Sequence, residues 1–424
     1  MIKELTIKKT SLPDEWSIKI LGDFTETING LWTGKKEPYI PVKVYTMSNF
    51  TKDSDLNHLK AAREVIASVS QYEKRKLKFG DILIEKSGGG PNQPVGRAVL
   101  FNIENNEDNT FSNFTTRLRI CEENKTDIDS NYLHKFLKLQ YLVGVTEKFQ
   151  KNSTNIRNLQ LKEYLQLEIP IPPLPQQKLI VTILDKAFAT IDTAKANTEQ
   201  NLQNAKELFE SYLQNVFENN ISGTQNSSLN DICELIVDCE HKTAPTQDTG
   251  YPSIRTPNIG QGVLILEGVN RVSEETYKEW TRRAVPQGND LILAREAPAG
   301  NIGVIPENVK VCLGQRTVLI RPKKDKFISK YLAFLILSKK VQKQLLSHST
   351  GATVQHINMR DIRAFKIYNL PTLIEQQNIL NGIERVLAET KKLEAIYTQK
   401  IADLEEMKKS VLEKAFSGQL KTLN

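Results

Sequence analysis

Two long stretches of the chain place apolar residues three and four positions apart, which is the pattern of a coiled-coil helix. The first follows Pro175 and runs to Phe217, and the second follows Pro371 and runs to Phe416. Proline ends the preceding strand in both places, and Gly418 follows the second stretch, where helices commonly end. A helix of about 40 residues is a rod of about 60 Å. The expected seam positions are Ile180, Leu184, Leu202, Leu208, Ile383, Leu404 and Val411.

The two helical stretches belong to an internal repeat with a period of about 199 residues. Residues 174–180 align with residues 373–379, and each segment carries a Gln-Gln pair. Residues 80–84 align with residues 289–293 in the globular parts. The chain therefore contains two copies of one unit, a globular segment followed by a long helix. Because the second globular segment lies between the two helices, the chain must return, and we expect the helices to pair antiparallel.

The globular segments combine short strand-like runs with amphipathic stretches, so the fold class is mixed α/β. We expect two pseudo-repeated globular α/β domains joined by two long helices that form an antiparallel coiled coil. The expected boundaries are 1–170 and 226–370 for the domains and 171–225 and 371–424 for the helical segments. Strands are expected at 41–45, 81–86, 95–101, 115–121, 262–267, 290–295, 302–305 and 317–321, and helices near 131–140 and 329–344.

The composition is that of an ordinary globular protein. Of 424 residues, 39% are hydrophobic, and 57 Lys+Arg against 50 Asp+Glu give a net charge of +7, with the excess in the two globular segments. No apolar run reaches the roughly 18–20 residues that span a bilayer, and the first residues lack the pattern of a signal peptide. With four cysteines and no CxxC pair, the sequence favours a reducing, cytoplasmic location without a membrane partner.

Motifs that carry catalytic or cofactor chemistry are not found. Residues 30–35 have one residue too few for a phosphate-binding loop and no Ser or Thr after the lysine. Cys233, Cys239 and His241 match no common zinc spacing, so we expect no metal. Pro172-Pro173 is not followed by the aromatic residue of an amino-methyltransferase motif. We therefore expect no covalent chemistry and no cofactor in this chain.

Polar, glycine-containing loops recur at matching places in both copies. Arg, Lys, Asn, Gln, Ser and Thr match the donor and acceptor patterns of base edges, and cations release counterions from phosphates. For any single residue, a solvated turn is the alternative, and Arg117 or Arg316 near a strand can instead serve a structural ion pair. The candidate DNA contacts are Lys35, Lys36, Lys86, Ser87, Asn92, Gln93, Thr154, Asn155, His241, Lys242, Thr243, Arg255, Asn258, Arg295, Gln315, Arg316, Thr353 and Gln355.

Two mildly basic domains at the ends of a rigid rod are held at a fixed distance, so together they would measure a fixed length of DNA. A double helix presents equivalent groove faces about every 34–36 Å, so a protein that reads two half-sites needs a spacer of that order.

The chain resembles the specificity subunit of type I restriction–modification systems over its whole length. The resemblance rests on Ile-Pro-Pro-Leu-Pro-Gln-Gln-Lys at 171–178, Leu-Pro-Thr-Leu-Ile-Glu-Gln-Gln at 370–377, the helix end at 410–418 and Gly-Asp-Ile-Leu at 80–83. Each motif is weakly specific, but their order and repetition are strongly so. The first copy departs by lacking the Lys-Ala-Phe-Ser-Gly ending of the second, which suggests asymmetric contacts at the two helix ends.

The resemblance implies a non-catalytic subunit whose two target-recognition domains each read half of a bipartite sequence in double-stranded DNA. The helices would set the gap and dock two adenine methyltransferase subunits that use S-adenosylmethionine. Two restriction subunits, with ATP and Mg²⁺, would join where the system contains them. Two alternatives remain: a fused restriction enzyme such as a single-chain methyltransferase, which needs the missing motif, and a coiled-coil scaffold that binds proteins, which would bind DNA without sequence preference.

Overall fold

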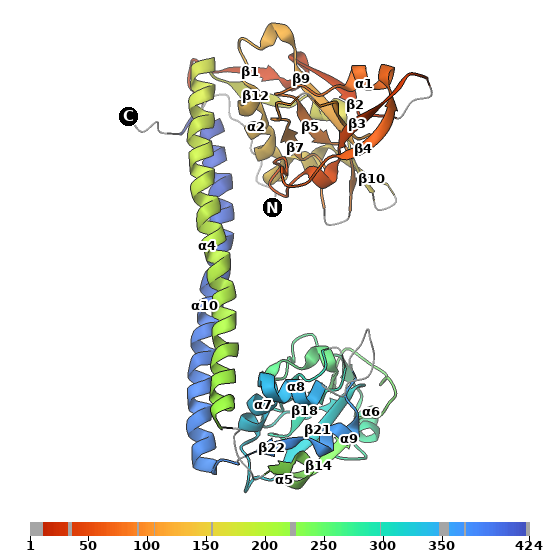
Figure 1. Ribbon diagram of the computed structural model, residues 1–424, viewed down its shortest axis with the longest axis vertical. Helices are drawn as coiled ribbons and strands as arrows, with labels where there is room; N and C mark the ends of the chain where they lie inside the picture. The colour runs from red at the N-terminus through yellow and green to blue at the C-terminus, as the bar shows by residue number, and fades with distance from the viewer. Residues whose placement is uncertain are drawn as a thin grey trace. The chain divides into compact units, whose positions relative to one another are not determined.

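The computed structural model describes residues 12–32, 36–90, 93–105, 107–153, 156–220, 226–296, 298–346, 356–368 and 370–420. The chain divides into two compact units (Figure 1). Unit 1 contains Met1–Thr198 and Gln399–Asn424, and unit 2 contains Glu199–Thr398. The two long helices, α4 (Leu174–Asn220) and α10 (Leu373–Phe416), are each shared between the units. Each unit thus holds one globular domain and one half of each helix, rather than consecutive segments of the chain.

Unit 1 is built around a four-stranded antiparallel sheet with the order β2-β9-β5-β7. A second sheet has the order β4-β3-β8, a third has β10-β11-β6, and β1 pairs with β12. The elements are β1 Ser17–Ile20, β2 Thr25–Asn29, β3 Tyr39–Tyr45, β4 Arg63–Ser68, α1 Val69–Arg75, β5 Ile82–Glu85, β6 Ser87–Gly89, β7 Ala98–Leu100, β8 Asn109–Phe111, β9 Thr115–Ile120, α2 Ser130–Leu142, β10 Gln150–Ser153, β11 Ile156–Leu159, α3 Leu161–Tyr164 and β12 Glu168–Ile171.

Unit 2 repeats this arrangement in a sheet with the order β14-β21-β18-β19-β16, of which the first four strands correspond to β2-β9-β5-β7. The added strand β16 pairs parallel with β19. The elements are β13 Asn226–Ser228, α5 Leu229–Ile232, β14 Cys233–Asp238, β15 Tyr251–Ile254, β16 Gln261–Val263, β17 Arg271–Val272, α6 Glu274–Trp280, β18 Leu291–Ala294, β19 Ile302–Val304, β20 Cys312–Leu313, β21 Thr317–Pro322, α7 Ser329–Leu337, α8 Lys339–Leu346, α9 Met359–Ala364 and β22 Lys366–Tyr368.

The aligned Asp-Ile-Leu and Asp-Leu-Ile segments form the same buried ion pair in each unit. Asp81 is 1% exposed and accepts a hydrogen bond from Arg119 Nε at 2.6 Å. Asp290 is 2% exposed and accepts one from Arg321 Nε at 2.8 Å. Each carboxylate also accepts a backbone N–H from the turn before its strand. This repeated motif therefore anchors a strand and its preceding turn.

The Gln-Gln pairs at the starts of the long helices each supply one fully buried glutamine. Gln177 accepts the backbone N–H of Asp129 at 2.9 Å and donates to the carbonyl of Pro172 at 2.8 Å. Gln376 accepts the N–H of Ile328 at 2.9 Å and donates to the carbonyl of Pro371 at 2.9 Å. In both units this amide ties the first turn of the long helix to the segment before α2 or α7.

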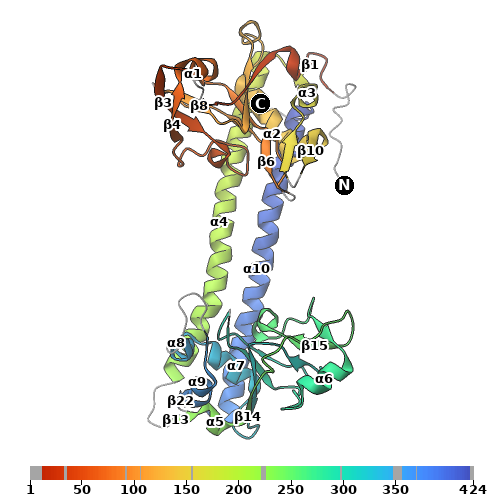
Figure 2. The same ribbon diagram turned by 90° about the vertical axis from the view of Figure 1, so that its right-hand side faces the viewer.

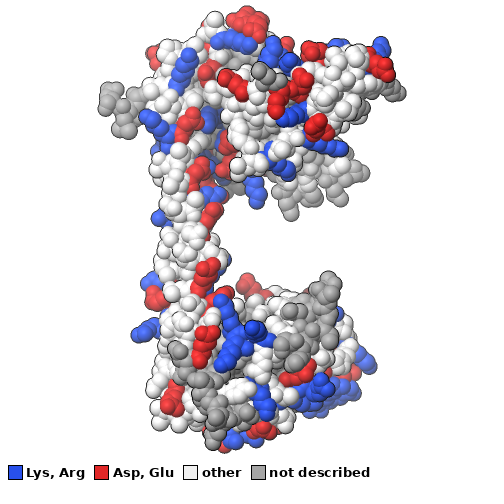
Figure 3. All heavy atoms as spheres, in the orientation of Figure 1, with Lys and Arg blue, Asp and Glu red and all other residues white. Residues whose placement is uncertain are grey.

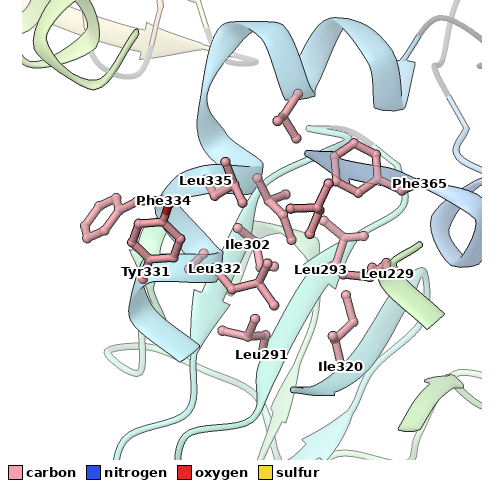
Figure 4. Packing of buried hydrophobic residues seen from close by; sticks show 14 of the residues in the cluster. Leu229, Leu291, Leu293, Ile302, Ile320, Tyr331, Leu332, Phe334, Leu335 and Phe365 are labelled. Carbon is pink, nitrogen blue, oxygen red and sulfur yellow. The ribbon is translucent and has the colours of Figure 1, made fainter. Parts of the chain in front are cut away.

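The helices run side by side in opposite chain directions, and each half packs on its own domain (Figures 1 and 2). In unit 1, Phe416 of α10 packs its ring edge-on against Tyr132 of α2, with 5.2 Å between ring centroids. In unit 2, Phe217 of α4 packs in the same way against Tyr331 of α7 at 5.5 Å. Figure 4 shows the adjoining core of unit 2, where α7 covers the strands that carry Leu291 and Ile302. The expected mixed α/β class with an antiparallel helix pair is confirmed.

The seam differs from expectation at one position. Ile180, Leu184 and Ile383 are buried, and Leu202, Leu404 and Val411 are half-buried. The placement of Leu208 in the seam is wrong, because this side chain is 53% exposed. Phe209 and Leu213 take the buried positions and pack into the unit 2 core. The α4 helix faces a domain as well as a partner helix here, so its buried stripe shifts from the ideal coiled-coil register.

Three expected elements differ in extent from their patterns. The strand expected at 95–101 is β7, which covers only Ala98–Leu100. The strand expected at 262–267 is β16, which covers only Gln261–Val263. The helix expected at 329–344 is broken at Ser338 into α7 and α8. Ser338 has extended backbone angles, and its hydroxyl donates to the carbonyl of Leu335 at 2.7 Å. This local hydrogen bond competes with helix continuation.

Candidate nucleic-acid interface

The candidate contacts gather at the same end of the equivalent sheets. In unit 1, β5 ends at Glu85, which pairs with Thr115 at the start of β9. In unit 2, β18 ends at Ala294, which pairs with Thr317 at the start of β21. Beyond these pairs lie Lys86 and the first β6 residue, Ser87, in unit 1, and Arg295, Gln315 and Arg316 in unit 2, where His241 follows the neighbouring end of β14. The structure thus brings predicted residues of each copy together at one sheet end.

In unit 1, Lys86 lies against two side chains that sequence reasoning missed. Its Nζ donates to Asn29 Oδ1 at 3.1 Å, and the Thr116 hydroxyl donates to the same oxygen at 3.1 Å. The neighbouring Ser87 hydroxyl donates to Asn158 Oδ1 at 2.6 Å. Burial lowers the pKa of Lys86. Among the described residues, no carboxylate lies within ion-pair distance of this ammonium group, so its positive charge is not neutralised.

A second cation, Arg75 at the end of α1, reaches the same place. Its Nε donates to the backbone carbonyls of Asn29 at 2.9 Å and Gly30 at 3.1 Å. Burial lowers the pKa of Arg75, and no ion-pair partner is present for it in the described ranges. Nothing in the sequence placed Arg75 here, because its position depends on the packing of α1 against β3, β4 and β8. Two unneutralised cations therefore flank Asn29.

In unit 2, the predicted Arg295 is the centre of a buried network. Arg295 is 7% exposed, and its Nη1 pairs with Asp238 Oδ2 at 2.6 Å while its Nε donates to the Ile357 carbonyl at 2.9 Å. Its Nη2 lies 2.9 Å from Nε2 of His356. This geometry gives Arg295 a positioning role for the surrounding loops. It departs from the expectation of an exposed base contact.

The network fixes the tautomer of His356 and continues to the surface. A guanidinium only donates, so His356 Nε2 accepts and its Nδ1–H donates to Glu296 Oε1 at 2.8 Å. Glu296 Oε2 pairs with Arg316 Nε at 2.8 Å, and the Arg316 side chain is 60% exposed. Arg316 has a φ of +68°, which few non-glycine residues adopt. The backbone at this loop therefore holds the Arg316 guanidinium at the surface.

The remaining candidates are placed as follows. His241 pairs with Asp238 at 3.3 Å, and Gln315 donates to the His241 carbonyl at 3.4 Å. Asn258 is half-buried, and its side-chain oxygen accepts the backbone N–H of Arg255. The side chains of Lys36, Gln93, Lys242, Thr243 and Arg255 are exposed. Lys35, Asn92, Thr154, Asn155, Thr353 and Gln355 lie outside the described residues.

Adjacent arginines form a basic cluster that sequence reasoning missed. Arg282 Nη2 and Arg283 Nε both pair with Glu240, each at 3.1 Å. One carboxylate cannot neutralise two guanidinium groups, so a positive charge remains beside the end of β14. The Arg-Arg dipeptide was the available signal. On the face drawn in Figure 3, Lys and Arg side chains are interspersed with Asp and Glu over much of the surface.

The cysteines have a structural setting. Cys233 and Cys239 are buried, and burial raises the pKa of the Cys233 thiol to about 12. The described residues contain no group of three His, Cys, Asp or Glu side chains arranged to hold a metal ion. None of the helices within the described ranges is long and apolar enough to cross a lipid bilayer.

Comparison with known proteins identifies the class to which this architecture belongs. Residues 13–204 and 221–405 each match the family model of the type I restriction modification DNA specificity domain. The matches cover most of the chain, one in each copy of the repeat, and the chain therefore belongs to this family. The family comprises the DNA-recognition components of type I restriction–modification systems, which are not themselves catalytic. The expected family is confirmed.

Individual relatives match over most or nearly all of the chain. The type I restriction enzyme MjaVIII specificity subunit of Methanocaldococcus jannaschii is 23% identical over 442 residues, covering 97% of this chain and 95% of that protein. The EcoBI specificity subunit of Escherichia coli is 23% identical over 329 residues, covering 71% of this chain and 68% of that protein.

Solved structures share the fold. A chain from a structural study of complex assembly and conformational transition in the type I R-M system has a TM-score of 0.74 at 17% identity, and the match covers 96% of this chain and 99% of that chain. The HsdS subunit from Thermoanaerobacter tengcongensis has a TM-score of 0.56 at 17% identity, covering 96% and 98%.

Proposed function

We propose that this specificity subunit reads a bipartite DNA sequence, one half with each unit, and docks adenine methyltransferase subunits on its long helices. The observation that carries the proposal is the recurrence of the candidate contacts at the equivalent sheet end in both units. Lys86 and Arg75 in unit 1, and the Arg282–Arg283 pair in unit 2, supply the positive charge that a phosphate backbone attracts. The exposed Arg255 and Arg316 and the half-buried Gln315 supply donors suited to base edges.

Exposed apolar residues on the helices support the docking of two copies of one partner. Leu208 and Met407 occupy equivalent positions of the repeat, and each is 53% exposed. A single exposed apolar side chain is ordinary on a protein surface, so the support comes from the repetition of this exposed apolar position in both units. The partners would use S-adenosylmethionine to methylate the N6 group of adenine. Restriction subunits, with ATP and Mg²⁺, would join where the system contains them.

Methylome mapping tests DNA reading directly. Cells that express this chain with its methyltransferase subunit are compared with cells that express the methyltransferase alone. We expect a split motif with N6-methyladenine in each half, present only with the chain. The absence of a new motif, while the same methyltransferase is active with another specificity subunit, would contradict the proposal.

Native mass spectrometry tests the docking positions. Leu208→Glu and Met407→Glu are each expected to remove one methyltransferase subunit from the complex, and the double variant both. Leu59→Glu is a matched control, because Leu59 is 99% exposed in a loop of unit 1 and lies on neither helix. Full assembly by the double variant would show that these side chains are not docking anchors.

A further inference from the structure

An apolar pocket lies at the candidate DNA-binding end of unit 1. Its walls come from the segment after β2, from β3 and the following turn, from β4, and from the connection between β8 and β9. Its lining combines the apolar residues Leu31, Val44, Met47, Val65 and Phe114 with Arg63 and four uncharged polar residues. These residues include no aspartate or glutamate. Phe114 is 49% exposed at this pocket, so an aromatic ring is available to a ligand.

Two walls of the pocket contact the strand that carries the candidate DNA contacts. The Phe114 carbonyl accepts the backbone N–H groups of Lys86 at 2.9 Å and Ser87 at 3.3 Å. Met47 packs so closely on Gly88 that a Cβ there would lie 2.6 Å from the Met47 Cε atom. The pocket is therefore continuous with the surface formed by residues 86–88.

The charge around the pocket indicates a polyanionic partner. Arg63 is exposed on the lining, Lys86 follows β5, and Arg75 binds the carbonyl of Gly30 next to the pocket residue Leu31. Within the described ranges none of these three cations has an ion-pair partner. A surface that combines unneutralised cations with an apolar depression suits DNA better than an apolar ligand, which gains nothing from the charge.

B-form DNA offers one apolar group in its major groove, the C5-methyl group of thymine. We propose that the Phe114 pocket binds the C5-methyl group of one thymine in the half-site read by unit 1. This inference rests on the proposed function and adds the base feature that unit 1 recognises.

Unit 2 presents different chemistry at the equivalent point. The carbonyl of Arg316 accepts the N–H of Arg295 at 2.8 Å, just as the carbonyl of Phe114 accepts that of Lys86. Arg316 is thus the counterpart of Phe114, and its guanidinium is held by Glu296. Recognition of a methyl group at this position is therefore expected in unit 1 and not in unit 2.

Uracil substitution removes the methyl group and leaves the pairing edge of the base intact. The experiment uses the full chain assembled with its methyltransferase subunits and a duplex that carries the mapped target. Each thymine is replaced singly by uracil, and equilibrium binding is measured. Every half-site that contains a methylatable adenine also contains a thymine opposite it, so at least one thymine is always present to be replaced. One thymine in one half is expected to lose about fourfold in affinity when its methyl group is removed.

Substitutions in the pocket test whether that thymine binds there. Phe114→Ala should weaken binding of the thymine duplex to about the level of the uracil duplex, while binding of the uracil duplex changes little. Met47→Ala should have the same selective effect to a smaller extent. Phe79→Ala is a matched control, because Phe79 is 54% exposed and precedes β5, at the opposite end of the sheet. It should keep the wild-type preference for thymine.

Three outcomes would overturn the inference. The first is that no thymine shows a methyl-dependent loss. The second is that Phe114→Ala weakens thymine and uracil duplexes equally. The third is that Phe114→Ala impairs methyltransferase assembly without changing the thymine preference, which would assign the pocket to a protein partner. If the wild-type complex instead bound DNA without sequence preference, the proposed function itself would fail.

Discussion

At the scale of single residues, the most strongly repeated side chains hold the fold together. Asp81 and Asp290 are buried in ion pairs, and Gln177 and Gln376 are fully buried at the helix starts. Arg295, predicted as a DNA contact, is buried for a related reason, since Asp238 and the Ile357 carbonyl surround its guanidinium. A repeated polar residue therefore indicates a repeated structural requirement at least as often as repeated chemistry.

Asp81→Asn is expected to destabilise unit 1 by about 3 kcal/mol, because a mostly buried Arg119 loses its charged partner. Asp290→Asn should have a comparable effect in unit 2. Denaturant unfolding followed by peptide-resolved hydrogen exchange reports the two units separately. Asp14→Asn, which removes the same charge from an exposed position, should change stability by less than about 0.5 kcal/mol. Equal effects of Asp81→Asn and Asp14→Asn would contradict this account of the pair.

At the scale of elements, the two units attach their domains to the helices with different chemistry. In unit 1, Lys408 of α10 pairs with Asp192 of α4 and with Asp53 of the domain. The Nζ atoms of Lys408, Lys135 and Lys138 lie 5.2–5.6 Å from the ring centroid of Phe188.

The repeat counterparts of Lys408 and Lys135 in unit 2 are aromatic. They are Phe209 and Phe334, whose ring centroids are 6.2 Å apart. One junction is therefore ionic and the other apolar, although both hold a domain on the same pair of helices.

Salt should distinguish the two junctions. Raising the ionic strength is expected to increase hydrogen exchange around residues 52–56 of unit 1, because Asp53 and Asp192 are about half exposed and their attraction to Lys408 is screened. Exchange at the Phe209 junction should not respond. Lys408→Met should reduce the salt response of unit 1 and leave the part due to the Asp55–Lys138 pair. Phe209→Ala should destabilise unit 2 by about 3 kcal/mol at any salt concentration. An undiminished salt response in Lys408→Met would assign it to other groups.

The same ion pairs predict a pH window for the unit 1 junction. Burial alone would raise the pKa of Asp53, but the hydrogen bond and charge of Lys408 outweigh it and hold the pKa below the ordinary value of 3.8. The stabilisation is therefore complete above pH 3.8 and is lost as the pH falls through the depressed value.

At the alkaline limit, burial alone would lower the pKa of Lys408, but its bonds to Asp192 and Asp53 raise it above 10.5. This contribution is complete below pH 10.5 and is lost as the pH rises through the raised value. After correction for the intrinsic pH dependence of amide exchange, the protection of residues 52–56 should be constant around neutral pH. Below pH 6.5 it should already weaken, because Nε2 of the buried His134 lies 2.9 Å from the Ser54 carbonyl and burial lowers the pKa of His134 to about 4. A midpoint near neutrality would contradict the assignment.

At the scale of the whole molecule, two copies of one unit share a helix pair, and each unit combines residues from distant parts of the chain. The sequence boundaries follow the order of segments along the chain. The compact units do not, because antiparallel helices bring the end of the chain back to the first domain.

Inserting four residues at matched positions of both helices tests whether helix length sets the spacer between the two half-sequences. The mapped methylation motif should keep its two half-sequences and gain a longer spacer, because the helices would set the separation of the two reading surfaces. Insertion of four residues in the exposed loop near Leu59 is the control and should leave the spacer unchanged. An unaltered spacer in an active complex with lengthened helices would exclude this role.

Patterns that depend on neighbouring residues were readable from the sequence by itself. Helix periodicity, prolines that end strands and a repeat that aligns Gln177 with Gln376 determined two α/β units, an antiparallel helix pair and the family. These features are local or repeated, so tertiary context does not reverse them.

Only the tertiary structure decided which polar residues reach the surface. It turned Leu208 outward, buried Arg295 against Asp238, and brought Arg75 to Asn29. It also placed Phe114 in one unit where Arg316 stands in the other. Exposure and charge pairing arise between residues far apart in the chain, and no spacing along the sequence encodes which partner a side chain meets.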